Sequence, residues 1–327
     1  MNEAALIELK DVVKEFPMSS GSGAFWRKEV VHAVSGMSLT IKRGEIFALV
    51  GESGCGKSTL GRLMINLLPV TSGEVIYDGN TISSIPIDKM GKLRARMQIV
   101  FQDPYASLNP RMNVRNIIAE PIITHKTIAG KKEVDERVKD LLLKVGIRPQ
   151  LMTRFPHQFS GGQRQRIGIA RALALDPEFI VCDEPVSALD VSIQSQILNL
   201  LRDLQDEMKL TYLFISHDLS VVRYLSNRVC VMFLGKICEM GATKEIYNNP
   251  MHPYTRFLLE AVPKPDPTKR KDKEVLLGEI PSPVRPPTGC RFHTRCPYCD
   301  HICSKEAPPI KEIGGRVIAC HKAGVAT

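Results

Sequence analysis

Residues Gly51 to Ser58 have the types and spacing needed to hold a chain of phosphates. The segment reads Gly-Glu-Ser-Gly-Cys-Gly-Lys-Ser and fits the pattern G-x-x-x-x-G-K-[ST] in full. Its glycines let backbone N–H groups turn inward around phosphate oxygens, and a helix that begins here adds the positive end of its dipole. Lys57 can reach the β- and γ-phosphates, and the Ser58 hydroxyl can ligate Mg²⁺. The predicted nucleotide contacts are Gly51, Ser53, Gly54, Cys55, Gly56, Lys57, Ser58 and Thr59.

A pair of acids supplies the second half of this chemistry. Asp183 and Glu184 directly follow the apolar run 179–182. Asp183 is expected to hold Mg²⁺ through water, and Glu184 can polarise the attacking water as a general base. Two acids that only solvate the end of a strand are the alternative, as is a glycine-rich turn that binds nothing. The two motifs together favour hydrolysis of a nucleoside triphosphate.

Buried strands must position both groups. The short apolar runs 46–50, 179–182 and 211–215 are typical of strands buried on both faces. Strands alternating with helices predict an α/β fold with a parallel core. A loop is predicted at 19–23, and we find no internal repeat. The other predicted strands are 6–16, 30–41, 73–78 and 98–101, and the predicted helices are 59–68, 131–145, 168–175 and 193–208.

Composition is that of an ordinary globular chain. Hydrophobic residues make up 43% of the 327 residues and charged residues 24%, with a net charge of +9. Nucleic-acid binding is one interpretation of this excess. However, the basic residues are scattered, which fits a nucleotide and anionic lipid better. No apolar run approaches the ~20 residues of a membrane helix, and the N-terminus does not read as a secretion signal. A membrane role is therefore expected to come through a partner.

The segment 159–163 reads Phe-Ser-Gly-Gly-Gln. A serine before two glycines at a helix start forms an anion-binding end, and an ordinary helix N-cap is the alternative. After the phosphate loop and the acid pair, this segment resembles the signature of the ATPase subunits of ATP-binding-cassette transporters. The resemblance implies a RecA-like core, an antiparallel β subdomain and a helical subdomain. It also implies that the signature contacts the γ-phosphate held by an opposite subunit, through Ser160, Gly161, Gly162 and Gln163.

Other segments match this family in order. Gln102, in Phe-Gln-Asp-Pro, resembles the Q-loop residue that senses Mg²⁺ and the lytic water and couples to the membrane subunit. Asp190 ends a segment that resembles the D-loop, which links the two sites of a dimer. His217 resembles the switch histidine that touches the γ-phosphate. Phe16 is the candidate for stacking on adenine, although Phe25 and Trp26 in the nearby loop leave this assignment open.

The composition changes near residue 262, where proline becomes frequent and five of the nine cysteines gather. We expect a cassette ATPase domain over 1–262 and an irregular extension over 263–327. Without a secretion signal, clustered cysteines favour metal ligands over disulfides. Zn²⁺, an iron–sulfur cluster and unligated thiols all remain open. The histidines that keep zinc open are His293, His301 and His321.

The segment 252–255 and the cysteine cluster resemble those of dipeptide and oligopeptide importers, a feature shared with importers of nickel or glutathione. This resemblance implies a [4Fe–4S] cluster, and Cys299 is then the odd thiol, with Cys296-x-x-Cys299 as an alternative ligand pair. The implied ligands are Cys290, Cys296, Cys303 and Cys320.

The implied function is ATP hydrolysis that powers peptide uptake at the cytoplasmic face of the membrane. The implied partners are a second ATPase subunit, two transmembrane permease subunits and, indirectly, an extracytoplasmic peptide-binding protein. A soluble cassette ATPase acting on nucleic acid is a rival, but such proteins usually carry two cassettes or a long coiled coil. A non-catalytic ATP-binding partner is a second rival, and the intact Lys57, Asp183, Glu184 and His217 argue against it.

Overall fold

The structure, a computed structural model, describes residues 4–18, 29–262 and 278–323. The chain forms two compact units. Unit 1 comprises Met1–Lys42, Ile46–Ser84 and Ser216–Thr327, and unit 2 comprises Arg43–Glu45 and Ile85–Ile215. The loop predicted at 19–23, with Phe25 and Trp26, lies outside the described residues. Within the described ranges, no helix has the length and apolar character needed to cross a membrane.

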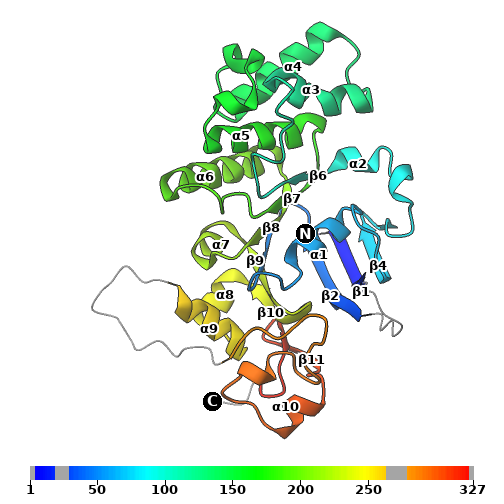
Figure 1. Cartoon of the computed structure of the whole chain (residues 1–327), viewed down its shortest axis with the longest axis vertical. Coiled ribbons are helices and arrows are strands. Elements are labelled where there is room, and N and C mark those ends of the chain that lie inside the picture. Colours follow the sequence, from blue (N-terminus) through cyan, green and yellow to red (C-terminus); the bar gives the residue numbers. More distant parts are fainter. Residues whose placement is uncertain (1–3, 19–28, 263–277, 324–327) are drawn as a thin grey trace, which may run out of the picture. The chain divides into compact units, whose positions relative to one another are not determined.

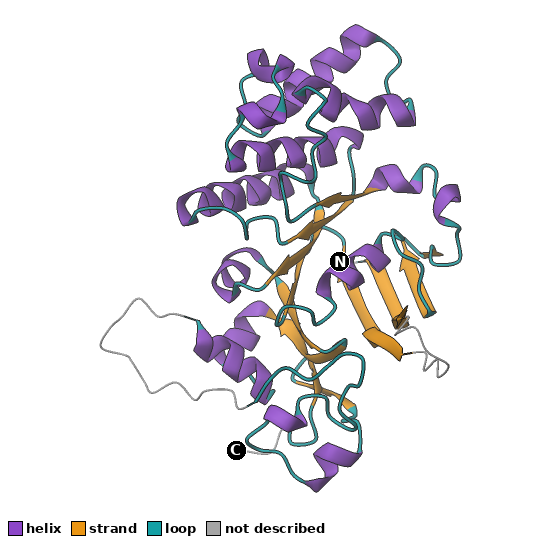
Figure 2. Cartoon of the chain, in the orientation of Figure 1, coloured by secondary structure: helices purple, strands orange, loops and turns teal. Residues whose placement is uncertain are grey.

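The strands of unit 1 form an antiparallel sheet and a mixed group (Figures 1 and 2). The antiparallel sheet, predicted from the family resemblance, has the order β2-β1-β4-β5 and contains β1 (Ala5–Met18), β2 (Glu29–Lys42), β4 (Ser72–Tyr77) and β5 (Asn80–Thr81). The mixed group has the order β11-β12-β10-β9-β3. It contains β3 (Ile46–Val50), β9 (Arg228–Phe233), β10 (Lys236–Ala242), β11 (Ile310–Ile313) and β12 (Arg316–Ala319). In this group β3 pairs with β9 in parallel, whereas β9 with β10, β10 with β12 and β11 with β12 are antiparallel.

The helices of unit 1 include the one that follows the phosphate loop. The helix predicted at 59–68 is α1 (Lys57–Met64), which begins earlier because Gly56 caps it and ends earlier because Asn66 adopts a left-handed φ of 51°. The strand before it is buried at all five positions, as its apolar run predicts. Among its described residues, unit 1 also contains the helices α7 (Leu219–Leu225), α8 (Thr243–Asn248), α9 (Pro253–Ala261), η6 (His293–Arg295) and α10 (His301–Lys305).

Unit 2 combines a parallel sheet with most of the long helices (Figure 2). Its strands β6 (Met97–Val100), β7 (Phe179–Asp183) and β8 (Thr211–Ser216) pair in parallel, which confirms the predicted parallel core. The helix predicted at 168–175 begins seven residues earlier, because Ser160 and Gln163 form a capping box. The helices are η1 (Ile87–Lys89), α2 (Leu93–Arg96), α3 (Val114–His125), α4 (Lys131–Lys144), η2 (Pro149–Thr153), η3 (Pro156–Gln158), α5 (Gly161–Ala172), η4 (Leu173–Leu175) and α6 (Val191–Met208).

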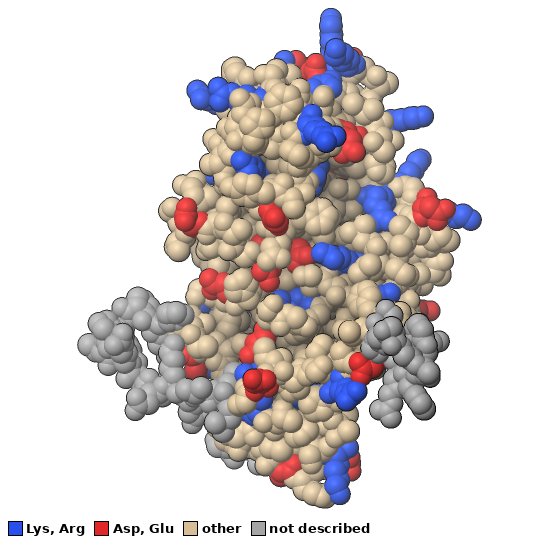
Figure 3. Space-filling view, viewed as in Figure 1, with Lys and Arg blue, Asp and Glu red and all other residues tan. Residues whose placement is uncertain are grey.

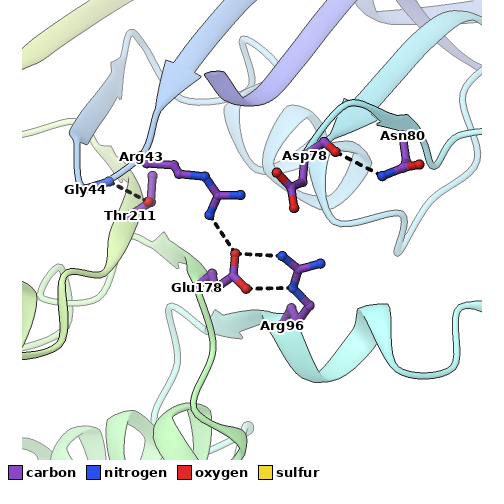
Figure 4. A network of polar contacts seen from close by, with 7 residues as sticks. All are labelled: Arg43, Gly44, Asp78, Asn80, Arg96, Glu178 and Thr211. Atoms are coloured by element: carbon purple, nitrogen blue, oxygen red, sulfur yellow. Dashed lines mark hydrogen bonds and ion pairs between the residues drawn. The ribbon is translucent and has the colours of Figure 1, made fainter. Parts of the chain in front are cut away.

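A polar network in unit 2 ties together the amino ends of its strands (Figure 4). Glu178, directly before β7, accepts hydrogen bonds from Arg96 Nε at 2.7 Å and Nη2 at 2.9 Å, and from Arg43 Nη1 at 2.9 Å. The Arg96 hydrogen bond lowers the pKa of Glu178. The Gly44 N–H donates to Thr211 Oγ1, at the start of β8, at 2.9 Å. With these ends fixed, the opposite end of β7 holds its acidic residues in a defined place.

Charges of both signs mix on the face shown in Figure 3. Lys and Arg side chains on that face are dispersed among Asp and Glu over both units, as the scattered basic residues of the sequence predict. The charges on this face therefore form no extended patch of one sign.

Candidate nucleotide site and cysteine pocket

The phosphate loop depends on glycine for its path. Gly56 has a φ of 102°, and a Cβ atom there would lie 2.1 Å from the carbonyl oxygen of Ala33. A Cβ atom at Gly51 would lie 2.1 Å from the carbonyl oxygen of Met232. No side chain fits at either distance. The loop therefore packs directly on neighbouring backbone, and α1 begins at its end.

Lys57 and Glu52 fix the interior of this loop. Lys57 is 4% exposed, and its Nζ donates to the carbonyl oxygens of Gly51 at 2.8 Å and Glu52 at 2.9 Å. The N–H of Glu52 donates to the Tyr254 hydroxyl at 2.9 Å. Burial raises the pKa of Cys55, whose sulfur lies 3.8 Å from Lys57 Nζ. The loop thus carries a buried cation and an uncharged thiol, while Ser53 and Gly54 are exposed and Ser58 and Thr59 are half-buried.

The two predicted acids stand at the carboxyl end of β7. Asp183 is 3% exposed and Glu184 is half-buried. Glu184 has a left-handed φ of 47°, and its N–H donates to the Ile215 carbonyl at 3.1 Å. Gln102 Nε2 donates to Glu184 Oε2 at 3.0 Å. The structure therefore brings together Gln102 and Glu184, two residues predicted to act on the same water.

The signature segment forms a capped helix start. The Ser160 side chain accepts from the Gln163 N–H at 3.4 Å, and Gln163 Oε1 accepts from the Ser160 N–H at 3.1 Å. Gly162 is buried, and a Cβ atom there would lie 2.4 Å from Ile193 Cγ2 in α6. The ordinary structural roles of this segment, a helix cap and close helix packing, are therefore both present. Ser160 itself is exposed and Gly161 is half-buried, so their N-terminal position remains accessible to an anion.

The remaining predicted nucleotide residues lie at strand and helix ends. Asp190 is exposed at the N-cap of α6. His217 is exposed between β8 and α7, and the next residue, Asp218, caps α7 by accepting from the Ser220 N–H at 2.7 Å. Phe16 is half-buried in β1, with Lys14 Nζ 5.0 Å from its ring centroid. Each of these side chains sits on a defined element, but their contacts with nucleotide stay predictions.

Four of the five clustered cysteines line one cavity in unit 1. The cavity has a volume of about 320 Å³. Cys299 is not among its lining residues; it is exposed and its thiol donates to the Asp300 carbonyl at 3.5 Å. The cysteines that line it are Cys290, Cys296, Cys303 and Cys320, and the histidines are His252, His293 and His321.

Two of the thiols that line this cavity are hard to ionise. Burial raises the pKa of Cys290 and of Cys296 to about 11, so both thiols are protonated at neutral pH unless a cation lies beside them. A zinc ion needs its sulfur ligands about 2.3 Å from one point. In the described part of the chain, no group of three or more His, Cys, Asp or Glu side chains is placed to hold a metal ion. The extension is also less irregular than predicted, because β11 and β12 form a hairpin paired with β10.

Comparison with known proteins identifies the family. Residues 34–187 match the family described as ABC transporter, and residues 238–303 match the oligopeptide/dipeptide transporter C-terminal region. The oligopeptide transport ATP-binding protein AppF of Bacillus subtilis is 53% identical over 98% of each chain. The chain belongs to the ABC transporter family. Another ABC relative, the oligopeptide transport ATP-binding protein OppF of Escherichia coli, is 49% identical over 97% of this chain and 96% of its own.

Solved ABC cassettes share the fold. The dimeric MJ0796 cassette has 30% identity and a TM-score of 0.64, and covers 72% of this chain and 98% of its own. The post-hydrolysis dimer of MJ0796 bound to ADP and Pi has 30% identity and a TM-score of 0.63, with the same coverage. The cassette fold predicted from the motifs is therefore confirmed.

Sequence reasoning missed one group of residues beside the ABC phosphate loop. Tyr254 lies in the segment 252–255, whose resemblance to peptide importers says nothing of the phosphate loop, yet its hydroxyl accepts the Glu52 N–H. Arg295, in the cysteine extension, donates from Nη1 to both carboxylate oxygens of Glu52, at 2.8 and 3.1 Å. No sequence signal links these positions, because they are far apart in the chain.

Proposed function

We propose that this chain is the ATP-binding and ATP-hydrolysing subunit of an importer of dipeptides or oligopeptides. The observation that carries the proposal is the union, in one chain, of a complete cassette motif set with an extension of the oligopeptide/dipeptide transporter type. The relatives named above, which match along nearly the full chain, carry oligopeptide transport in their names. The cargo itself would contact other subunits.

We further propose a division of labour among the residues. Lys57 and the N–H groups of 51–59 bind the phosphates, and Glu184 accepts the proton of the attacking water. Gln102, which donates to Glu184, orients that water, and His217 contacts the γ-phosphate. Ser58 and Asp183 offer the oxygen ligands that Mg²⁺ prefers, and the ion would neutralise charge on the phosphates. Catalysis of this kind is mostly positioning and charge stabilisation.

The proposed assembly places the signature residues 160–163 against ATP held by a second cassette subunit, with Asp190 linking the two sites. Phe16 is the proposed adenine contact. The two cassette subunits would bind two permease subunits at the cytoplasmic face of the membrane. An extracytoplasmic peptide-binding protein would deliver the cargo to the permease subunits. The proposed domain division remains 1–262 for the cassette and 263–327 for the extension.

The cysteine cavity is proposed to hold a [4Fe–4S] cluster. Its lining contains the four cysteines that the subgroup resemblance implies and leaves out Cys299. Four thiolates, each bound to its own iron, suit a roomy cavity better than ligands that must meet at one ion. The cluster would supply a covalent brace for a chain segment with little core of its own.

Metal and sulfide analysis on protein purified without oxygen tests the cluster. About four irons and four sulfides per chain are expected. Single Cys→Ser changes at the four lining positions should each lower the iron content, whereas Cys299→Ser should leave it unchanged. One zinc per chain with no iron, or loss of iron only in the Cys299 variant, would refute this ligand set.

Peptide uptake into proteoliposomes tests the function. The complete transporter, reconstituted with its binding protein, should accumulate a tripeptide only with ATP. The Glu184→Gln variant should lose at least 100-fold in ATP turnover while still binding ATP, because a general base contributes about 10²–10⁴-fold. Near-normal turnover in that variant would remove Glu184 as the base, and ATP turnover stimulated by nucleic acid instead of peptide would overturn the importer.

A further inference from the structure

Glu52 is held at three points inside the phosphate loop. Its N–H donates to the Tyr254 hydroxyl at 2.9 Å, and its carbonyl oxygen accepts from Lys57 Nζ at 2.9 Å. Its carboxylate accepts two hydrogen bonds from Arg295 Nη1, at 2.8 and 3.1 Å. One residue of the loop is thus fixed through its backbone and its side chain at once.

Arg295 comes from the cysteine extension. It ends η6, directly before Cys296, and its side chain is 7% exposed, against 21% for that of Glu52. Arg295 Nε is buried and has no hydrogen-bond partner among the described residues. Burying an ion pair with an unsatisfied donor is weak support for stability and can be unfavourable. This points to a role for the pair other than holding the fold together.

The aromatic packing gives the same segment a second hold on the loop. Phe292, also between two of the pocket cysteines, is 1% exposed and lies 5.2 Å from the Tyr254 ring. Tyr254 is fully buried and is the residue that accepts the Glu52 N–H. The segment 292–295 therefore contacts Glu52 directly through the Arg295 ion pair. It also supports Glu52 indirectly, because Phe292 packs on Tyr254.

The ion pair with Arg295 matters for phosphate binding because Glu52 is negatively charged. A loop that binds a polyphosphate gains from positive charge and backbone N–H groups, and a carboxylate within it repels the ligand. The two hydrogen bonds from Arg295 Nη1 pair that carboxylate in a partly buried place, where charges are poorly screened. Without Arg295, the Glu52 carboxylate would lose these two hydrogen bonds and leave an unpaired negative charge in the phosphate loop.

We propose that Arg295 is a positioning residue of the nucleotide site, pairing the charge of Glu52 so that the phosphate loop accepts ATP. The cysteine extension then completes the ATP site of its own chain. This inference rests on the proposed binding of phosphates by residues 51–58. It concerns the ground-state affinity for nucleotide and assigns Arg295 no contact with the reacting atoms.

Nucleotide titrations on the full chain, by calorimetry, test the proposal. The variants are Arg295→Ala, Glu52→Gln and the double variant, measured with ATP and with ADP. Arg285→Ala is the matched control, since Arg285 lies in the same extension and pairs with Glu29, but its side chain is 75% exposed. Lys57→Ala tests the underlying site. If this variant bound ATP as tightly as the natural protein, the proposed phosphate site would be wrong, whatever the result for Arg295.

Arg295→Ala should weaken ATP binding about tenfold, equivalent to about 1.4 kcal/mol, and weaken ADP binding less because ADP carries less charge. Glu52→Gln should bind ATP at least as tightly as the natural protein. The double variant should recover at least half of the loss on a logarithmic scale. If the pair only anchored the loop, Glu52→Gln would weaken ATP binding, because the substitution weakens the anchor.

Three results would overturn the proposal: ATP affinity of Arg295→Ala within twofold of the Arg285→Ala control, no recovery in the double variant, or a loss above threefold in Glu52→Gln. Thermal unfolding and iron content are measured for every variant. If Arg295→Ala does not fold, Arg295→Lys and Glu52→Gln decide the matter. The lysine keeps the charge and should bind ATP within about threefold of the natural protein, and a tenfold loss there would count against charge pairing.

Discussion

Replacing Phe292 by alanine should destabilise unit 1 strongly, although Phe292 lies in a proline- and cysteine-rich extension. The ring is 1% exposed and has aromatic neighbours on several sides. Its centroid lies 5.2 Å from Tyr254, 5.4 Å from Phe233, 5.9 Å from His252 and 6.3 Å from Phe257. Deleting a buried phenylalanine costs about 3–5 kcal/mol, and each lost aromatic pair adds about 0.5–1.5. Partial collapse of the site offsets some of this, so we expect about 4 kcal/mol.

Urea unfolding followed by circular dichroism measures the effect. With a slope of about 1–3 kcal/mol per molar urea or somewhat above, the midpoint of the affected transition should fall by on the order of 1 M or more. Phe155→Ala is the control, because it deletes the same atoms from a ring in a residue that is 39% exposed. It should cost less than about 1 kcal/mol. Phe292→Leu, which keeps most of the apolar volume, should fall between the two.

The reasoning would be refuted if Phe292→Ala and Phe155→Ala shifted the midpoint equally. The ring would then contribute no more than a surface residue, and the extension would not share a core with the cassette strands of unit 1. A shift of the expected size would mean that truncating the extension destabilises the nucleotide-binding unit itself.

Three further perturbations have definite expected outcomes. Gly162→Ala should destabilise the protein by about 1–3 kcal/mol in urea unfolding, because its Cβ atom would lie 2.4 Å from Ile193 Cγ2. Adding Ile193→Ala should restore part of this loss. No loss in the single variant would show that the two helices adjust freely. Burial lowers the pKa of His252 to about 4, and its neutral Nδ1 accepts the Tyr254 N–H. Between about pH 6.5 and 4 the unfolded chain therefore takes up a proton that the folded chain does not. The free energy of unfolding should fall by up to roughly 3 kcal/mol over this window. His252→Asn keeps an N-cap acceptor and should flatten the pH dependence of the melting temperature over that window, whereas an unchanged slope would exclude this histidine as its cause. Glu178→Gln should lower the free energy of unfolding by about 1 kcal/mol, because the carboxylate pairs with two arginines but is 36% exposed. High salt should reduce this effect. An effect that salt does not reduce would indicate packing instead of charge.

The catalytic chemistry could be predicted from the sequence because each part of it is local. The phosphate loop needs glycines, a lysine and a hydroxyl within eight consecutive positions, and Asp183 with Glu184 needs only an apolar run before it. Such motifs fix their own backbone: Gly56 has a φ of 102°, which glycine adopts without strain. The strands β3, β7 and β8 were equally predictable, since full burial requires an uninterrupted apolar run.

Element boundaries were less accessible. The start of α5 at Gly161 is fixed by a reciprocal cap between Ser160 and Gln163, which outweighs the low helix propensity of two glycines. The end of α1 is fixed by the left-handed backbone at Asn66, not by any loss of apolar periodicity. Helix α3 and the strands after Asn227 were not predicted, although residues 229–233 form an apolar run like that of β3 and are all buried.

By itself, the sequence determined the ATP chemistry of this protein and its family, because those depend on residue types at short fixed spacings. Only the tertiary structure decided which cysteines share a cavity, since Cys299 stands between Cys296 and Cys303 in the chain yet turns outward to Asp300. Spacing along a loop does not fix where thiols point. The structure alone also joined Arg295 to Glu52, because an ion pair between distant residues arises only when the folded backbone brings both charges into one buried place.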